Sequence, residues 1–90
     1  MKVTRQKVAR KLIDYLYHHI TLSELVEWAE SAMMEADFDE QNLEIIREVV
    51  GRVGLSDVRA FGMSWEDCED FLSRLGYQVR IEVTQKQVTA

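Results

Sequence analysis

The stretch that decides the fold is residues 21–36, which read TLSELVEWAESAMMEA. Thr21 and Glu24 have the spacing of a capping box, in which each side chain accepts a hydrogen bond from a free backbone amide at a helix start. Past this cap, apolar side chains recur every three or four residues and share one helix face, while the glutamates face away. The apolar set is Leu22, Leu25, Ala29, Ala32, Met33 and Ala36. We therefore predict a helix with a buried face rich in small side chains.

The same period appears in three further segments, and the chain has no proline to interrupt them. We expect Asp39 to cap the third helix and Gly54 to end it in a left-handed conformation. Ser64 and Asp67 offer a cap for the fourth helix, and Gly76 closes it. The four predicted helices cover about 4–20, 22–36, 40–53 and 65–75.

The end of the chain changes period. In residues 77–83 apolar and polar side chains alternate, which is the pattern of a half-buried strand. A single strand leaves its backbone groups without partners. We expect this segment to pair with residues 1–4, to pair with a second copy of the chain, or to lie extended against the helices.

These segments predict one all-α domain over residues 1–90, because a chain of this length supports a single modest core. The expected architecture is a four-helix bundle with a short extra helical turn in residues 56–61 and an extended or strand-like C-terminal segment. Hydrophobic residues make up 47% of the chain and charged ones 30%, which is typical of a globular protein. The aromatic residues expected in the core are Trp28, Phe61, Trp65 and Phe71.

Several features favour the cytoplasm as location. No stretch approaches the roughly 20 apolar residues that span a bilayer, and the N-terminus lacks the apolar core of a signal peptide. The single cysteine, Cys68, has no partner for an internal disulfide, which fits a reducing compartment. We expect no contact with a membrane.

Charge is distributed unevenly. The first eleven residues carry five cations and no acid, whereas residues 14–48 hold ten acids and only one cation, Arg47. The formal net charge of −5 disfavours a nucleic-acid surface, because such a surface needs clustered cations whose field is not cancelled nearby. The basic start allows three interpretations, which are attraction to an anionic partner, pairing with the acidic helices of the same chain, and head-to-tail pairing between copies. Pairing within the chain is the simplest, because a bundle with short loops places the first helix beside the others.

The acidic residues of the second helix and the loop after it form the candidate contact surface. Exposed carboxylates attract a basic protein partner, and an adaptable methionine among them fits a contact residue. The alternative is a solvated face that keeps the domain soluble. The candidate partner contacts are Glu24, Glu27, Glu30, Met34, Glu35, Asp37, Asp39 and Glu40.

Residues capable of catalysis are few and poorly placed. His18 and His19 are adjacent and point about 100° apart on a helix, so they do not share a metal; by angle His19 lies on the apolar face. Cys68 lies on an apolar stripe among acids that disfavour a thiolate. No phosphate-binding loop or nucleophile motif occurs. We predict a protein that is not an enzyme and has no cofactor or metal; a small enzyme of unknown type is the second alternative.

The first alternative is a winged-helix DNA-binding regulator built on residues 56–83. A short helix, a turn at Gly62, a helix and then an extended strand occur in the order of a helix-turn-helix with a wing. The helix that would read DNA exposes Glu66, Glu69 and Asp70, which repel phosphates. We therefore favour binding to a protein partner over binding to DNA.

A family resemblance rests on LVEWAE at residues 25–30 and DVRAFGMSWED at residues 57–67. With these segments the chain resembles small acidic helical bacterial proteins of unknown function, over most of its length. In size, acidity and helicity it is also similar to bacterial immunity proteins and small antitoxins, which neutralise basic nuclease-type toxins. This second similarity is architectural, and it implies a non-enzymatic interaction module.

Overall fold

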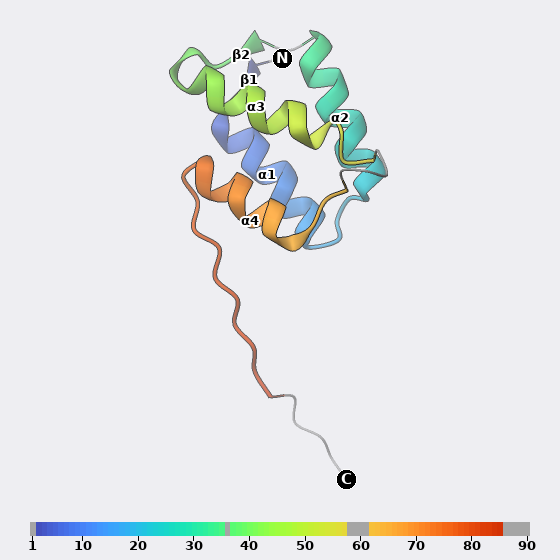
Figure 1. The fold of residues 1–90 in the computed structure, drawn as a ribbon, viewed down its shortest axis with the longest axis vertical. Helices are drawn as coiled ribbons and strands as arrows, with labels where there is room; N and C mark the ends of the chain where they lie inside the picture. Colours follow the sequence, from blue (N-terminus) through green and yellow to red (C-terminus); the bar gives the residue numbers. More distant parts are fainter. Residues whose placement is uncertain (1, 36, 58–61, 86–90) are drawn as a thin grey trace.

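The computed structural model describes residues 2–35, 37–57 and 62–85, and these residues are mostly helical (Figure 1). The predicted helical class is therefore confirmed, while the finer expectation of a regular four-helix bundle stays a prediction. The elements are β1 (Lys2–Val3), α1 (Arg5–Leu16), α2 (Leu22–Glu35), β2 (Asp37–Phe38), the 3₁₀ turn η1 (Glu40–Asn42), α3 (Leu43–Val53) and α4 (Trp65–Arg74).

The helix starts follow the local signals in the sequence. At α2 the Thr21 amide donates to Glu24 Oε1 at 3.0 Å, and the Glu24 amide donates to Thr21 Oγ1 at 3.1 Å. Ser64 and Asp67 form the same reciprocal box at α4, at 2.9 and 3.1 Å. The capping predictions for α2 and α4 are confirmed, because each box needs only residues three positions apart.

Helix α1 ends at Leu16, so the prediction of a helix to residue 20 was wrong. His18 has a φ of 63°, in the left-handed region. Its amide donates to the Tyr15 carbonyl at 3.0 Å, and the His19 amide donates to the Asp14 carbonyl at 2.8 Å. These two bonds are those of a Schellman motif, which satisfies the last carbonyls of the helix. Glycine normally occupies this position, and here it is a histidine. Neither the residue type nor the apolar period therefore indicated that the helix ends at Leu16.

Helix α3 is preceded by η1, whose Gln41 amide donates to Asp39 Oδ1 at 3.2 Å. Asp39 is thus a cap, as predicted, but of the 3₁₀ turn that leads into the helix. Gly54 has a φ of −61°, so the predicted left-handed end was wrong. The Ser56 amide donates to the Val53 carbonyl at 3.0 Å, and tightened turns end this helix. Gly76, with a φ of 95°, does end α4 as predicted.

A short parallel ladder joins the start of the chain to the segment after α2. Lys2 is opposite Asp37 and Val3 is opposite Phe38, and the Asp39 amide donates to the Val3 carbonyl at 3.0 Å. The start of the chain therefore pairs with residues 37–38, in the expected loop after the second helix, and not with residues 77–83. In residues 77–85 no strand is formed, so the expectation of a strand over 77–83 is not met.

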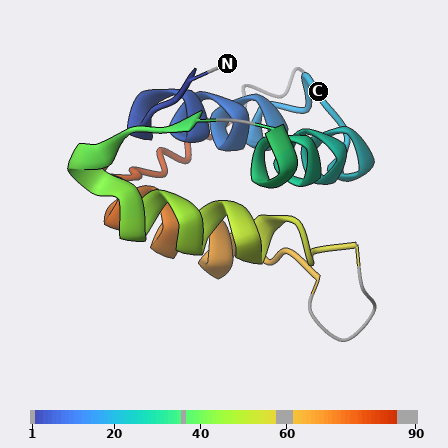
Figure 2. The same cartoon turned by 90° about the horizontal axis from the view of Figure 1, so that it is seen from above.

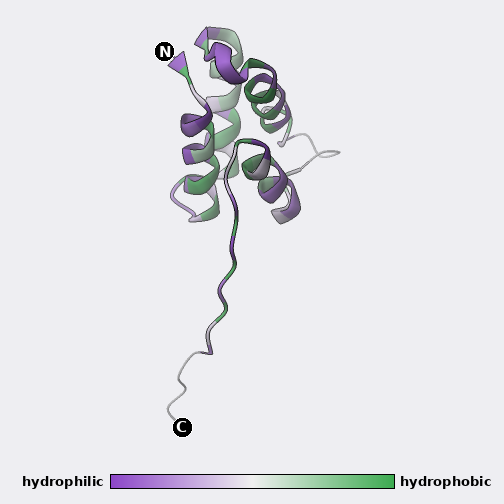
Figure 3. Cartoon of the chain, turned by 90° about the vertical axis from the view of Figure 1, so that its left-hand side faces the viewer, coloured by the Kyte–Doolittle hydropathy of each residue, from purple (hydrophilic) through white to green (hydrophobic). Residues whose placement is uncertain are grey.

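The core lies among α1, α2, α3 and α4, and α4 contributes to it from its place against α1 (Figures 1 and 2). Each helix turns an apolar side toward the others and a polar side outward (Figure 3). Phe71 is buried and Trp28 packs at the margin of the core, as expected. Trp65 is 39% exposed, so its assignment to the core was wrong. Phe61, residues 58–60 of the expected helical turn and Ala36 lie outside the described residues.

Candidate functional site

The outer face of α2 carries a stripe of exposed side chains. Glu27, Glu30 and Met34 are three and four residues apart, which places them on one side of the helix, and Glu35 follows beside them. Met34 is 84% exposed, the position expected for it from the sequence. We refer to these four residues as the α2 acidic stripe. From Glu27 to Glu35 it runs about 12 Å at the 1.5 Å rise of an α-helix.

Two of the eight candidate contact residues are engaged within the fold. The Glu24 carboxylate accepts the Thr21 amide at the start of α2, and the Asp39 carboxylate accepts the Gln41 amide in η1. Both carboxylates stabilise helix starts, where the helix dipole also favours negative charge. Glu24 and Asp39 therefore have a structural role as caps, in addition to any contact with a partner.

The remaining candidates, Asp37 and Glu40, lie past the C-terminal end of α2 and are exposed. They border a shallow hollow together with Lys2, which is in register with Asp37 across the ladder. A cation therefore lies close to this second acidic group, unlike the α2 acidic stripe. The eight residues divide into the stripe, the two caps and this hollow.

The α2 acidic stripe has no ion-pair partner among the described parts of the chain. The ion pairs recorded there join His19 to Asp14, Arg52 to Asp67 and Arg74 to Glu48. None involves the basic start of the chain, so the predicted pairing of that segment with the acidic helices is not found. Lys11 instead lies over the Trp28 ring, with Nζ 5.7 Å from its centroid.

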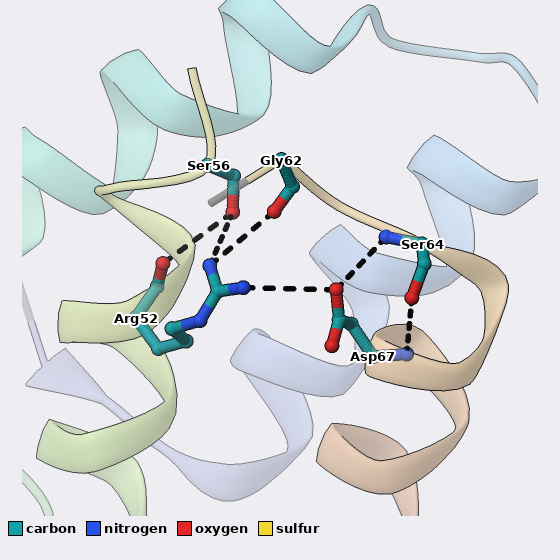
Figure 4. Close-up of polar contacts among 5 residues, drawn as sticks. All are labelled: Arg52, Ser56, Gly62, Ser64 and Asp67. Atoms are coloured by element: carbon teal, nitrogen blue, oxygen red, sulfur yellow. Dashed lines mark hydrogen bonds and ion pairs between the residues drawn. The ribbon is translucent and has the colours of Figure 1, made fainter. Parts of the chain in front are cut away.

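A polar cluster centred on Arg52 joins α3 to the start of α4 (Figure 4). Arg52 Nη1 donates to the Gly62 carbonyl at 3.3 Å and to Ser56 Oγ at 3.5 Å, and Nη2 lies 3.6 Å from Asp67 Oδ2. The hydrogen bond from the Ser64 amide is the main cause that lowers the pKa of Asp67; desolvation opposes it, and the Ser64 side chain and then Arg52 lower the pKa further. Every group in the cluster faces another member, so we assign it a structural role as a clamp.

The candidate chemical residues do not assemble. Burial, with the nearby Asp67 charge, raises the pKa of the Cys68 thiol to about 11, which keeps it protonated at neutral pH. His19 is exposed beyond the end of α1, 3.6 Å from Asp14, so its placement on the apolar face was wrong. Among the described residues, no three His, Cys, Asp or Glu side chains are grouped to hold a metal ion.

An apolar cleft that the sequence did not indicate lies between α1, α4 and the chain after α4. Its volume is about 440 Å³. One side is lined by Ile13 and Leu16 of α1, by Tyr17 just past its end, and by Trp65 and Leu72 of α4, and residues 77–81 form the other wall. The sequence did not indicate that Tyr17 and Trp65 line a cleft. The helical period places Trp65 on the apolar face of its helix, and Tyr17 lies just past the end of α1. The alternating pattern of residues 77–83 was the available signal.

The requirements of the DNA-binding alternative are only partly present. Glu66, Glu69 and Asp70 are exposed on α4, as expected, and Arg74 of the same helix is paired with Glu48. Residues 77–85 form no strand that would serve as a wing. These observations give the DNA alternative no support beyond the sequence pattern.

Comparison with known proteins adds no assignment: no family model, no curated protein and no solved structure matches this chain. Within residues 2–35, 37–57 and 62–85, no helix is both long and apolar enough to cross a membrane.

Proposed function

We propose that this protein is a non-enzymatic interaction module that binds a basic protein partner through the α2 acidic stripe. The observation that carries the proposal is the state of that stripe: three carboxylates and an exposed methionine on one helix, without a cation paired to them in the described structure. Asp37 and Glu40 extend the same charge past the end of the helix.

The physical reason is the self-repulsion of the stripe. Glu27 and Glu30 are like charges three residues apart on an exposed face, an arrangement that destabilises a helix by about 0.2–0.5 kcal/mol. A cationic surface placed over them removes this repulsion and adds attraction, which also speeds the encounter. Met34 supplies an adaptable apolar contact inside the charged ring.

This mode of binding is that of an immunity- or antitoxin-like protein, in which an acidic surface covers a basic toxin. A cytoplasmic module would also keep its buried Cys68 thiol reduced. The competing explanation is that the acids only keep the domain soluble, in which case their position on the surface is irrelevant and only their number matters.

Charge reversal at two places separates these explanations. The test variant is Glu27→Lys/Glu30→Lys/Glu35→Lys, and the matched control is Glu66→Lys/Glu69→Lys/Asp70→Lys on α4. Each changes the formal net charge from −5 to +1 at exposed positions. The measurement is capture of basic proteins from a lysate, followed by titration of the captured partner at low and high salt.

The proposal predicts that the control retains most of the binding and that the stripe variant loses it, by at least about tenfold in affinity, equivalent to 1.4 kcal/mol. Equal loss in both variants would mean that net charge alone attracts the partner. Unchanged capture by the stripe variant would exclude this surface. Circular dichroism checks that both variants keep the helical content of the parent.

A further inference from the structure

The chain after α4 leaves the helices as an exposed segment, which we call the C-terminal arm (residues 77–85; Figure 1). Past the Tyr77 amide, which donates to the Leu72 carbonyl at 2.8 Å, no backbone group of the arm is hydrogen-bonded to another described residue. A row of free donors and acceptors is what a strand presents at the edge of a sheet. The arm is therefore able to accept a strand as partner.

The side chains of the arm divide into an apolar and a polar set, and the two colours alternate along it in Figure 3. Val79 packs against the core, whereas Ile81 is 64% and Val83 88% exposed. In an extended chain these three share one face, and Arg80 and Glu82 share the other. An exposed apolar row of this kind is a site at which another apolar surface can bind.

The charges of the arm are self-complementary in one pairing. When two arms run antiparallel with Ile81 opposite Ile81, Arg80 of each copy lies opposite Glu82 of the other, and Val79 lies opposite Val83. All apolar side chains then fall on one face of the ribbon. Each cation meets an acid, and both pairs form at once.

Other pairings are less favourable. A parallel pair in register sets Arg80 against Arg80 and Glu82 against Glu82. An antiparallel shift that centres the pair on Arg80 again opposes two cations. A shift by a single position turns the apolar side chains of one arm to the polar face of the other. The charges therefore select the pair centred on Ile81.

The apolar cleft gives this ribbon something to pack on. An isolated pair of strands is marginal in water and needs a further apolar layer. The cleft lies at the base of the arm, with Tyr17 and Trp65 exposed along it, and residues 77–81 already form one wall. A second arm laid beside the first extends that wall over the exposed aromatic rings.

We propose that the C-terminal arm is a self-association surface, and that its occupant is the arm of a second copy of this chain, paired antiparallel about Ile81. The surface uses α1, α4 and the arm and does not involve α2. The two proposals can therefore fail independently.

Charge-swap variants of the full chain test the proposal. Sedimentation equilibrium of the parent, from micromolar to millimolar concentration, should show a mass rising toward twice 10.5 kDa. Arg80→Glu alone and Glu82→Arg alone should each weaken association at least about tenfold, because each sets like charges across the pair. An equimolar mixture of the two variants should associate as well as the parent, since every opposed pair in the heterodimer is then complementary.

Disulfide trapping tests the direction of pairing. Ile81→Cys should form a crosslinked dimer on mild oxidation, whereas Val83→Cys should not, because residue 83 lies about 13 Å from its counterpart in an antiparallel pair. The native Cys68 is buried and does not compete. A parent that stays monomeric, single variants that associate as tightly as the parent, or crosslinking of both cysteine variants would each overturn the proposal.

Discussion

Replacing glycines at three positions tests the backbone of the structure. Gly76 ends α4 with a φ of 95°, and a Cβ there would lie 3.1 Å from Arg5 Nη1. Gly62 has a φ of 62° with nothing within 4 Å of a Cβ. Gly54 has a φ of −61°, and a Cβ would meet no atom closer than 3.5 Å. Alanine at position 76 therefore meets both backbone strain and a close contact, alanine at position 62 meets backbone strain alone, and alanine at position 54 meets neither.

The expected changes in the free energy of unfolding differ in sign. A left-handed conformation costs a residue with a Cβ roughly 1–2 kcal/mol, so Gly62→Ala should be destabilising by about that amount. Gly76→Ala should be worse, since the Arg5 guanidinium must also move. Gly54→Ala should stabilise the protein by about 0.4–1 kcal/mol, because alanine lowers the entropy of the unfolded chain without native strain.

Thermal unfolding followed by the helical circular dichroism signal measures all three. For a domain of this size about 1 kcal/mol shifts Tm by roughly 4–8 °C, so Gly54→Ala should unfold several degrees above the parent and the other two below it. A rise in Tm for Gly76→Ala would refute the left-handed end of α4. A fall for Gly54→Ala would refute the right-handed end of α3.

Three further predictions concern the other parts of the fold. Ser64→Ala should lower the free energy of unfolding by about 1 kcal/mol in urea titrations, through loss of the α4 cap, and the exposed Ser73→Ala serves as control. Folding lowers the pKa of Asp67 from its ordinary value of 3.8. The ionised carboxylate therefore stabilises the folded protein fully at pH values above 3.8, and this stabilisation is lost as the pH falls through the lowered pKa. The gap in urea midpoint between the parent and Asp67→Asn should accordingly shrink in acid, and a gap that is constant down to pH about 2 would contradict the assignment. The Cys68 thiol should react with a thiol reagent at neutral pH only as fast as the protein opens, and rapidly in denaturant; rapid reaction of the folded protein would contradict its burial.

The parts of the fold that were predictable are those that depend on neighbours in sequence. The capping boxes at Thr21 and Ser64 involve residues three positions apart, so the letters alone identify them. The end of α1 was not predictable, because its left-handed residue is His18 where glycine is usual. The ladder between residues 2–3 and 37–38 joins segments far apart in sequence, and two-residue strands leave no period to detect.

The candidate site was predictable to a similar degree. Exposure of Glu27, Glu30 and Met34 follows from their helical angle, which the sequence contains. The caps formed by Glu24 and Asp39 also follow from the sequence, because each involves residues only two or three positions apart. Among the described residues no cation pairs with the stripe, and this depends on tertiary packing that the helical period does not contain; Lys11, for example, lies over Trp28.

The two proposed surfaces have a joint consequence. The arm leaves the C-terminal end of α4 on the left of Figure 1 and extends away from the helices, whereas α2 lies on the right. A pair of copies joined by their arms would therefore leave both α2 acidic stripes free. Two linked sites bind a dense basic surface more tightly than one, because the second contact forms at a high effective concentration. Under this arrangement, Arg80→Glu should weaken binding to an immobilised basic partner while leaving the affinity for the same partner free in solution unchanged, and equal loss in both formats would show that the arm itself contacts the partner.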